Sequence, residues 1–236
     1  MINQTVEKGA IFFNFLAKDK ENAEAIVAAG DGLVVPGIAA ADFSSVTDAV
    51  KVVKRLKEAA PIVSIGLGGD GNIENWRKVL DIAEAANPGH INQPFNTAAY
   101  ARGYLDAKGH PHIVNALVRP SGTVGTILLP NGQEMAVDFF AALANDLGIQ
   151  SVKLMPVKGL KHLEELVALS SALAAVGVQG IEPAGGIQPE HIKPMYEAVR
   201  KTGIQWMMPH IFGAAIDKET GRTIPDVVHG MINSVR

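Results

Sequence analysis

The chain has 236 residues, of which 47% are hydrophobic and 24 are glycine, and its formal net charge is −3. This length can hold one large α/β domain or two small ones. The small net charge gives no reason to expect a nucleic acid or an anionic membrane as a partner. Because the sequence contains no cysteine, disulfides, thiolate catalysis and cysteine-bound zinc are excluded.

The first nine residues are polar and mixed in charge, and they lack the basic and then apolar layout of a signal peptide. No apolar run approaches the roughly 20 residues that a membrane-spanning helix needs. We therefore expect a soluble, cytoplasmic protein. Its apolar helices and two tryptophans favour a homo-oligomer.

Short apolar runs alternate with helical patterns along the whole sequence. Strands are predicted at residues 10–17, 33–39, 61–67, 90–93, 112–118, 151–155, 178–182 and 205–208. Helices are predicted at residues 21–29, 46–59, 73–86, 97–108, 138–147, 160–176, 189–202 and 225–235.

Strict alternation of strand and helix predicts parallel strands joined by right-handed crossovers. With no linker in the sequence, residues 1–236 are expected to form a single (β/α)8 TIM barrel, whose usual size is about 250 residues. A doubly wound open sheet is the alternative. It would carry a glycine-rich nucleotide loop after the first strand, where this chain has Leu16-Ala17-Lys18-Asp19.

One irregular passage follows the fifth predicted strand. Residues 124–129 and 133–137 flank Pro130-Asn131-Gly132, and an Asn-Gly pair is typical of a tight turn between antiparallel strands. We expect an inserted β-hairpin at this place.

In a barrel of this kind, the chemistry takes place at the carboxyl ends of the strands. Any one polar residue there could merely cap a barrel layer or a helix, so their convergence on one rim is the stronger signal. The polar residues expected at this rim are Asn14, Lys18, Asp42, Asp70, Asn92, Gln93, Asn115, Arg119, Lys153, Glu182 and His210. Among these, Asn92 and His210 are candidate substrate-binding residues.

The candidate nucleophile is Lys153, in the run S-V-K-L-M-P-V at residues 151–157. Burial disfavours a charged amine, which lowers its pKa and frees its lone pair to attack a carbonyl group. The alternative is a lysine whose amine simply extends to solvent at the end of a strand. The apolar neighbours Val152 and Leu154 indicate a buried strand and favour the nucleophile.

The run G-I-E-P-A-G-G-I at residues 180–187 ends a strand in Gly185-Gly186, just before a helix. Such a turn presents backbone N–H groups that suit a phosphate, although glycine pairs also make ordinary strand-to-helix turns. Its position after the seventh strand coincides with the usual phosphate site of this barrel. The loop of residues 68–71 (G-G-D-G) is interpreted as a turn, because Asp70 would repel an anion.

The histidines include no H-E-x-x-H or other close pair of ligands. A metal site therefore has no support in the sequence, and no metal and no cofactor is expected.

Two of these motifs resemble a known group of enzymes. S-V-K-L-M-P-V resembles the Lys-aromatic-aromatic-Pro strand of class I aldolases that cleave 2-keto-3-deoxy-6-phosphogluconate, and I-E-P-A-G-G-I resembles their Pro-Thr-Gly-Gly-Ile phosphate turn. The whole chain, from F-N-F-L-A-K-D-K-E-N-A through G-H-I-N-Q-P-F to M-P-H-I-F-G-A-A-I-D-K-E-T-G, looks more like a bacterial branch, the KDGP aldolase family. The likeness covers nearly the full length.

The resemblance implies that Lys153 forms a Schiff base and that Gly185 and Gly186 bind the phosphate of the substrate. It also implies cleavage of 2-keto-3-deoxy-6-phosphogluconate, or a close 2-keto-3-deoxy sugar acid, to pyruvate and glyceraldehyde 3-phosphate. The better-known aldolases have a general acid–base glutamate on the second strand, but residues 33–38 (L-V-V-P-G-I) contain none. Ala184 and Leu154-Met155 also depart from the commoner Thr and Phe-Phe.

Glu182 is the first candidate for the missing base, since a carboxylate at the barrel mouth could have its pKa raised by burial. The alternative for Glu182 is an ion pair that keeps Lys153 charged. Arg119 is a candidate for binding the substrate carboxylate, which a guanidinium group matches with two hydrogen bonds. Ser121, Gly122 and Thr123 could bind hydroxyl groups or phosphate.

Three alternative functions remain open at this point. The first is a barrel isomerase or epimerase of a phosphorylated sugar, with Asp70 and Glu182 as acid and base and Lys153 as a fixed charge. The second is a non-catalytic sugar-phosphate-binding protein, and the third is a metal-dependent aldolase.

Overall fold

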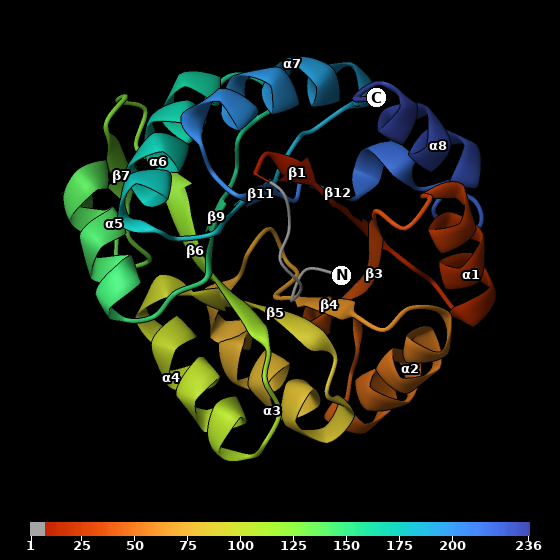
Figure 1. Ribbon diagram of the computed structural model, residues 1–236. Helices are drawn as coiled ribbons and strands as arrows, with labels where there is room; N and C mark the ends of the chain where they lie inside the picture. The colour runs from red at the N-terminus through yellow and green to blue at the C-terminus, as the bar shows by residue number, and fades with distance from the viewer. Residues whose placement is uncertain (1–7) are drawn as a thin grey trace.

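The computed structural model describes residues 8–236, which form a barrel of parallel strands surrounded by helices (Figure 1). The barrel strands are β1 (Ala10–Ile11), β2 (Phe13–Leu16), β3 (Val34–Ala39), β4 (Val63–Gly66), β5 (Gly89–Pro94), β6 (Ile113–Pro120), β9 (Ser151–Leu154), β10 (Gly180–Pro183), β11 (Trp206–Met207) and β12 (His210–Ile211).

The first and last strands of the barrel are each divided into two short parts. β1 pairs in parallel with β11, and β2 pairs in parallel with β12, so the two ends of the sheet meet and close the barrel. The prediction of a (β/α)8 barrel is confirmed.

The helices lie on the outside and cover the strands (Figure 1). They are α1 (Lys20–Ala29), α2 (Val46–Ala59), α3 (Trp76–Ala86), α4 (Phe95–Ala107), α5 (Val137–Asp146), α6 (Leu163–Val176), α7 (Pro189–Val199) and α8 (Pro225–Asn233). Short 3-10 turns occur at Ala40–Asp42, Ile73–Asn75, Arg200–Thr202 and Gly213–Ala215. Within residues 8–236, none of the helices has the length and apolar character required to cross a bilayer.

Local sequence signals explain the bounds of α2, which begins and ends where the sequence predicts. The side chain of Ser45 accepts a hydrogen bond from the backbone N–H of Asp48 and so caps the first turn. Ala60 leaves the helical conformation because the next residue is Pro61, whose ring disfavours helix at the preceding position.

A hairpin of β7 (Thr126–Leu128) and β8 (Glu134–Ala136) follows β6, and β7 pairs antiparallel with both β6 and β8. The loop that leads into it is tied to α6, because the backbone N–H of Gly122 donates to Oε2 of Glu165 at 3.0 Å.

The inside of the barrel is filled in layers by side chains that alternate along each strand. At the amino end of the strands, a small apolar cluster contains Phe12, Val35, Ile113, Trp206 and Met208. The next layer toward the carboxyl end is polar and buried, and an open cavity follows it.

Gly180 marks a close approach within the apolar end layer. A Cβ atom at this position would lie 2.2 Å from Cζ2 of Trp206. We therefore expect Gly180→Ala to lower the free energy of unfolding by about 3 kcal/mol, because the buried indole ring has to move. Chemical denaturation would measure this loss. Gly103→Ala is the control, because an added Cβ on this exposed side of α4 would meet nothing beyond its own helix within 4 Å. It should stabilise the protein by about 1 kcal/mol. Equal stability of the Gly180→Ala variant and the parent would contradict this packing.

Candidate active site

The polar layer consists of inward-facing side chains on neighbouring strands. Lys153 on β9 is in register with Glu182 on β10. Asn92 on β5 is in register with Asn115 on β6, and Ser64 on β4 with His90 on β5. His210 is the first residue of β12. Each of these side chains is at most 5% exposed, so the layer has to satisfy its own hydrogen bonds.

Glu182 is the centre of this layer, and four side chains donate hydrogen bonds to its carboxylate. Oε1 accepts from the hydroxyl of Ser151 at 2.6 Å and from Nε2 of His90 at 3.1 Å. Oε2 accepts from Nδ2 of Asn115 at 2.6 Å and from Nε2 of His210 at 2.7 Å. Burial by itself would raise the pKa of Glu182, but the imidazoles of His90 and His210 hold it well below its usual value. Glu182 is therefore an ionised carboxylate.

This geometry contradicts one expectation from the sequence. Glu182 does not lie at the mouth of the barrel with a raised pKa, since it is 0% exposed and its pKa is lowered. The reason is that an inward-facing residue on β10 points into the layer below the cavity, where donors from four other strands meet it.

Lys153 lies at the boundary between the polar layer and the cavity. Its Nζ donates to Oδ1 of Asn92 at 2.8 Å and lies 3.3 Å from Nδ1 of His210. Burial lowers the pKa of Lys153 to about 8, while the charge of Glu182 opposes this shift. Both groups that contact the amine directly are uncharged hydrogen-bond acceptors. Because the pKa is about 8, a substantial fraction of the Lys153 side chains carries a neutral amine near pH 8.

The proton of His210 is assigned by its neighbours. A carboxylate can only accept, so Nε2 of His210 carries the proton that is donated to Glu182, and Nδ1 presents its lone pair to the amine of Lys153. Burial and the nearby charge of Lys153 lower the pKa of His210 to about 3. His210 is therefore a neutral acceptor directed at the lysine amine.

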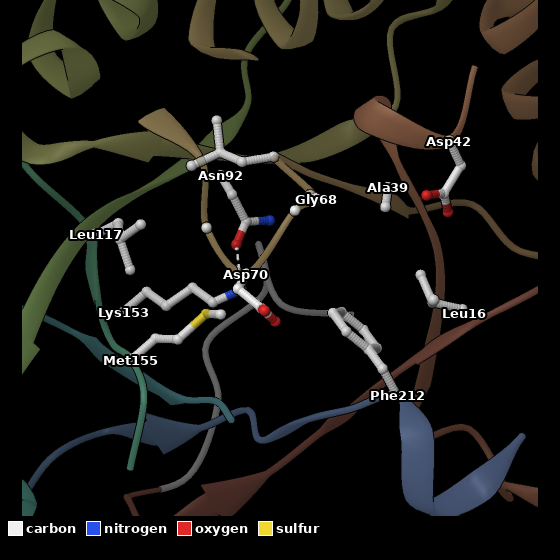
Figure 2. A pocket seen from close by; sticks show the side chains of 14 residues that line it. Leu16, Ala39, Asp42, Gly68, Asp70, Asn92, Leu117, Lys153, Met155 and Phe212 are labelled. Atoms are coloured by element: carbon white, nitrogen blue, oxygen red, sulfur yellow. Dashed lines mark hydrogen bonds between the residues drawn. The ribbon is translucent and has the colours of Figure 1, made fainter. Parts of the chain in front are cut away.

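The cavity above Lys153 has a volume of about 190 Å³. Figure 2 shows the amine of Lys153 reaching into it beside Asn92 and opposite Phe212, whose ring centroid is 5.9 Å from Nζ. The wall consists of Leu16, Ala39, Asp42, Gly66, Leu67, Gly68, Gly69, Asp70, Gly71, Asn92, Leu117, Lys153, Met155 and Phe212.

A second cavity opens next to the first, and Asp70 and Met155 line both. Its other wall residues are Pro156, Lys158, Gly185 and Gly186. Gly185 has φ +94, and a Cβ there would lie 2.8 Å from Cβ of Pro156, so the close approach of these two loops requires glycine. This cavity combines a lysine side chain with a glycine turn at the start of α7.

The structure brings together only part of the set proposed from the sequence. Lys153, Asn92 and His210 are in direct contact, and Gly185 and Gly186 line the adjoining cavity. By contrast, Arg119, Ser121, Gly122 and Thr123 belong to the segment around the hairpin and line neither cavity. The hydroxyl of Ser121 contacts that of Thr126 at 2.6 Å and accepts from the backbone N–H of Thr123 at 3.0 Å, so it organises its own turn.

Sequence reasoning missed the role of Ser64, His90 and Ser151 in the polar layer. Ser151 lies two residues before Lys153, and this spacing puts both side chains on the same face of a strand. That signal was available for Ser151, whereas the contacts of Ser64 and His90 depend on which strands are neighbours. Within residues 8–236, no three His, Cys, Asp or Glu side chains gather in a group that could hold a metal ion.

The fold and the site define a (β/α)8-barrel enzyme with a buried amine at its catalytic end. The chain belongs to the KDGP aldolase family, whose profile matches residues 7–219, and it is therefore a carbon–carbon lyase of the aldolase type. It is 33% identical over 235 residues to the 2-dehydro-3-deoxy-phosphogluconate aldolase of Salmonella typhimurium (strain 14028s / SGSC 2262). That alignment covers 96% of this chain and 95% of the relative.

Solved structures with the same architecture have much lower sequence identity. Thiamine phosphate pyrophosphorylase from Pyrococcus furiosus matches with a TM-score of 0.60 and 11% identity, over 97% of this chain and 96% of that chain. A 3-hexulose-6-phosphate synthase matches with a TM-score of 0.57 and 16% identity, over 94% of this chain and 99% of that chain. At these identities, the likeness concerns the fold alone.

The arrangement predicts two effects of Glu182→Gln. An amide cannot accept from all four donors, so we expect the free energy of unfolding to fall by about 3 kcal/mol. Loss of the negative charge should also lower the pKa of Lys153, because Glu182 raises it. The pH dependence of reductive methylation at Lys153, followed by peptide mass mapping, would measure the second effect.

Glu165→Gln is the matched control for this experiment. Glu165 is also a buried carboxylate, 5% exposed, but it bonds to Gly122 and His162 outside the barrel interior. This variant should lose stability without moving the pKa of Lys153. An unchanged Lys153 titration in Glu182→Gln would contradict the coupling between the two residues.

Proposed function

We propose that the protein is a class I aldolase in which Lys153 forms a Schiff base with a 2-keto-3-deoxy-6-phospho sugar acid. The favoured substrate is 2-keto-3-deoxy-6-phosphogluconate, with pyruvate and glyceraldehyde 3-phosphate as products. The Salmonella relative is named as an aldolase of 2-dehydro-3-deoxy-phosphogluconate, which supports this choice of substrate. It also favours an aldolase over the isomerase and the sugar-phosphate-binding protein.

One observation carries the proposal, namely the environment of the lysine amine. Lys153 is 5% exposed, its pKa is lowered to about 8, and its nitrogen lies on the wall of a cavity. A lysine that served only as a fixed positive charge would gain from a carboxylate in direct contact, whereas Lys153 contacts an amide oxygen and a neutral imidazole. These partners suit an amine that must lose its proton to attack a carbonyl carbon.

The reaction then follows from imine chemistry. The nitrogen of Lys153 attacks C2 of the substrate, and loss of water from the carbinolamine gives a protonated imine. A base removes the proton of the C4 hydroxyl, the C3–C4 bond breaks, and its electron pair moves through C2 to the iminium nitrogen. Glyceraldehyde 3-phosphate leaves with C4 as its aldehyde carbon. Protonation of the enamine at C3 and hydrolysis of the imine release pyruvate and restore the lysine.

His210 and Asn92 hold the reacting nitrogen in place. The Nδ1 atom of His210, 3.3 Å from Nζ of Lys153, accepts a hydrogen bond from the amine and so positions it for addition to C2. Glu182 acts through His210 as a positioning residue, because its hydrogen bond from Nε2 sets the tautomer and orientation of the ring.

The second cavity is the proposed site of the substrate phosphate. Lys158 supplies a positive charge, and Gly185 and Gly186 leave room for an oxyanion to approach the backbone at the start of α7. Arg119 remains our candidate for the carboxylate of the substrate, and Ser121, Gly122 and Thr123 remain candidates for its hydroxyl groups. Arg119 lies two positions after Leu117 on β6, so both residues are on the same face of the strand, and Leu117 lines the first cavity.

Borohydride trapping with pyruvate tests the proposed chemistry. Reduction of an imine should leave a three-carbon adduct on the Lys153 peptide. Lys153→Arg keeps the positive charge but cannot form an imine, so we expect no adduct and a loss of turnover of at least 10³-fold, on the order of the larger covalent-catalysis effects. Lys158→Arg is the matched control, since it keeps the charge in the second cavity and leaves the nucleophile in place. An adduct on another lysine would assign the Schiff base to that lysine. Appreciable turnover by the Lys153→Arg variant would favour an isomerase.

The pH dependence of kcat/KM gives an independent prediction. The nucleophile is the neutral amine, so activity should rise with pH and level off above the pKa of about 8 that Lys153 has in the free enzyme. Steady-state rates measured from about pH 6 to 10 would define this limb. An ascending limb with a midpoint near the ordinary lysine value of about 10.4 would contradict the lowered pKa.

A further inference from the structure

The proposed reaction lacks a base for the C4 hydroxyl, and the polar layer does not supply one. Glu182 is fully buried and its carboxylate already accepts four hydrogen bonds. His210 directs its free nitrogen at the amine of Lys153, which places it next to C2 rather than C4. The base has to come from the walls of the cavities.

The position of C4 follows from the two ends of the substrate. In the proposed complex, C2 is bonded to Lys153, which lines the first cavity, and the phosphate on C6 occupies the second cavity, which Gly185 and Gly186 line. C4 is midway along this chain of carbons, so it lies where the two cavities meet. The residues that line both cavities are Asp70 and Met155, and Met155 has no group that can take a proton.

We propose that Asp70 is the general base that removes the proton from the C4 hydroxyl. This assignment rests on the proposed function and deepens it. The carboxylate of Asp70 takes the proton, and the electron pair of the O–H bond becomes part of the C4 carbonyl group. The C3–C4 electron pair moves to the iminium, and Asp70 is left as the neutral acid.

The conformation of the Asp70 loop supports this role. Gly68, Gly69, Asp70 and Gly71 all have positive φ, with +53 at Asp70. A non-glycine residue in this region is uncommon, and such conformations are concentrated at functional sites. The loop is closed by hydrogen bonds from the N–H groups of Gly71 and Asn72 to the carbonyl oxygen of Gly68, at 3.1 and 3.0 Å.

The loop also packs against the inner wall, which holds Asp70 at the junction. A Cβ atom at Gly71 would lie 3.2 Å from Leu117 and 3.6 Å from Met155. Figure 2 shows Asp70 over the cavity that receives the amine of Lys153. Among residues 8–236, no side chain or backbone group bonds to the carboxylate of Asp70, so its oxygens are available to a substrate.

Trapping with the sugar acid itself tests this inference. Asp70→Asn removes the base but keeps the shape and tolerates the left-handed backbone. With 2-keto-3-deoxy-6-phosphogluconate and borohydride, we expect the Lys153 peptide of this variant to carry the uncleaved six-carbon adduct. The parent enzyme should carry the three-carbon adduct of the cleaved substrate. The kcat for cleavage should fall by about 10²–10⁴-fold, the range of general-base catalysis, with a change in KM of less than about threefold.

Two further variants complete the test. Asp81→Asn removes an exposed carboxylate on α3 that lines neither cavity, and it should keep the kcat of the parent if Asp70 is the base. Glycine adopts the positive φ of position 70 without steric cost, so the Asp70→Gly variant should fold at least as well as the parent. It should lose kcat to the same extent as Asp70→Asn. Melting temperatures of the variants check folding directly.

The outcomes separate this inference from the proposed function. If the Asp70 variants form the pyruvate adduct on Lys153 and still cleave the sugar acid at the parent rate, Asp70 is not the base and the Schiff base stands. A loss confined to KM would make Asp70 a binding residue and overturn its catalytic role. If the parent enzyme forms no pyruvate adduct, the proposed function itself fails.

Discussion

The site depends on one buried negative charge. The carboxylate of Glu182 is removed from water inside the barrel, and it stays ionised only because Ser151, His90, Asn115 and His210 donate to it. The hydrogen bond from Nε2 of His210 to Glu182 orients the imidazole, and Nδ1 of the same ring then faces Lys153. The charge also moderates the lowered pKa of the lysine amine. One carboxylate thus links the packing of the barrel interior to the state of its reactive nitrogen.

Much of the fold follows from local signals in the sequence. The alternation of apolar runs with helical patterns predicts the barrel, because each strand has to bury both faces and each helix only one. Ser45 and Pro61 bound α2, and Gly185-Gly186 ends β10 before α7. Lys153 stands out for the same reason, since a charged residue flanked by Val152 and Leu154 on a fully buried strand needs a special environment.

The depth of each side chain in the barrel could not be predicted in this way. The sequence predicts that the side chain of Glu182 points into the barrel, but it does not predict which donors surround the carboxylate. These donors come from other strands, and His90 is 92 positions away in the sequence. The pKa of Glu182 therefore moves in the direction opposite to the expected one. Asp70 is a different case: the sequence places it in a turn at the catalytic rim and gives it an acid–base role only in the isomerase alternative. The cavity walls show that this turn borders both cavities.

The polar layer also bears on how the strands find their alignment. Aliphatic side chains pack almost equally well after a slip of two residues, because such a slip preserves which face each residue occupies. The same slip would separate Glu182 from Lys153, and Asn92 from Asn115, which are now in register. An unpaired charge would then be buried, at a cost of several kcal/mol. The groups that carry the chemistry therefore also discriminate against misaligned barrels.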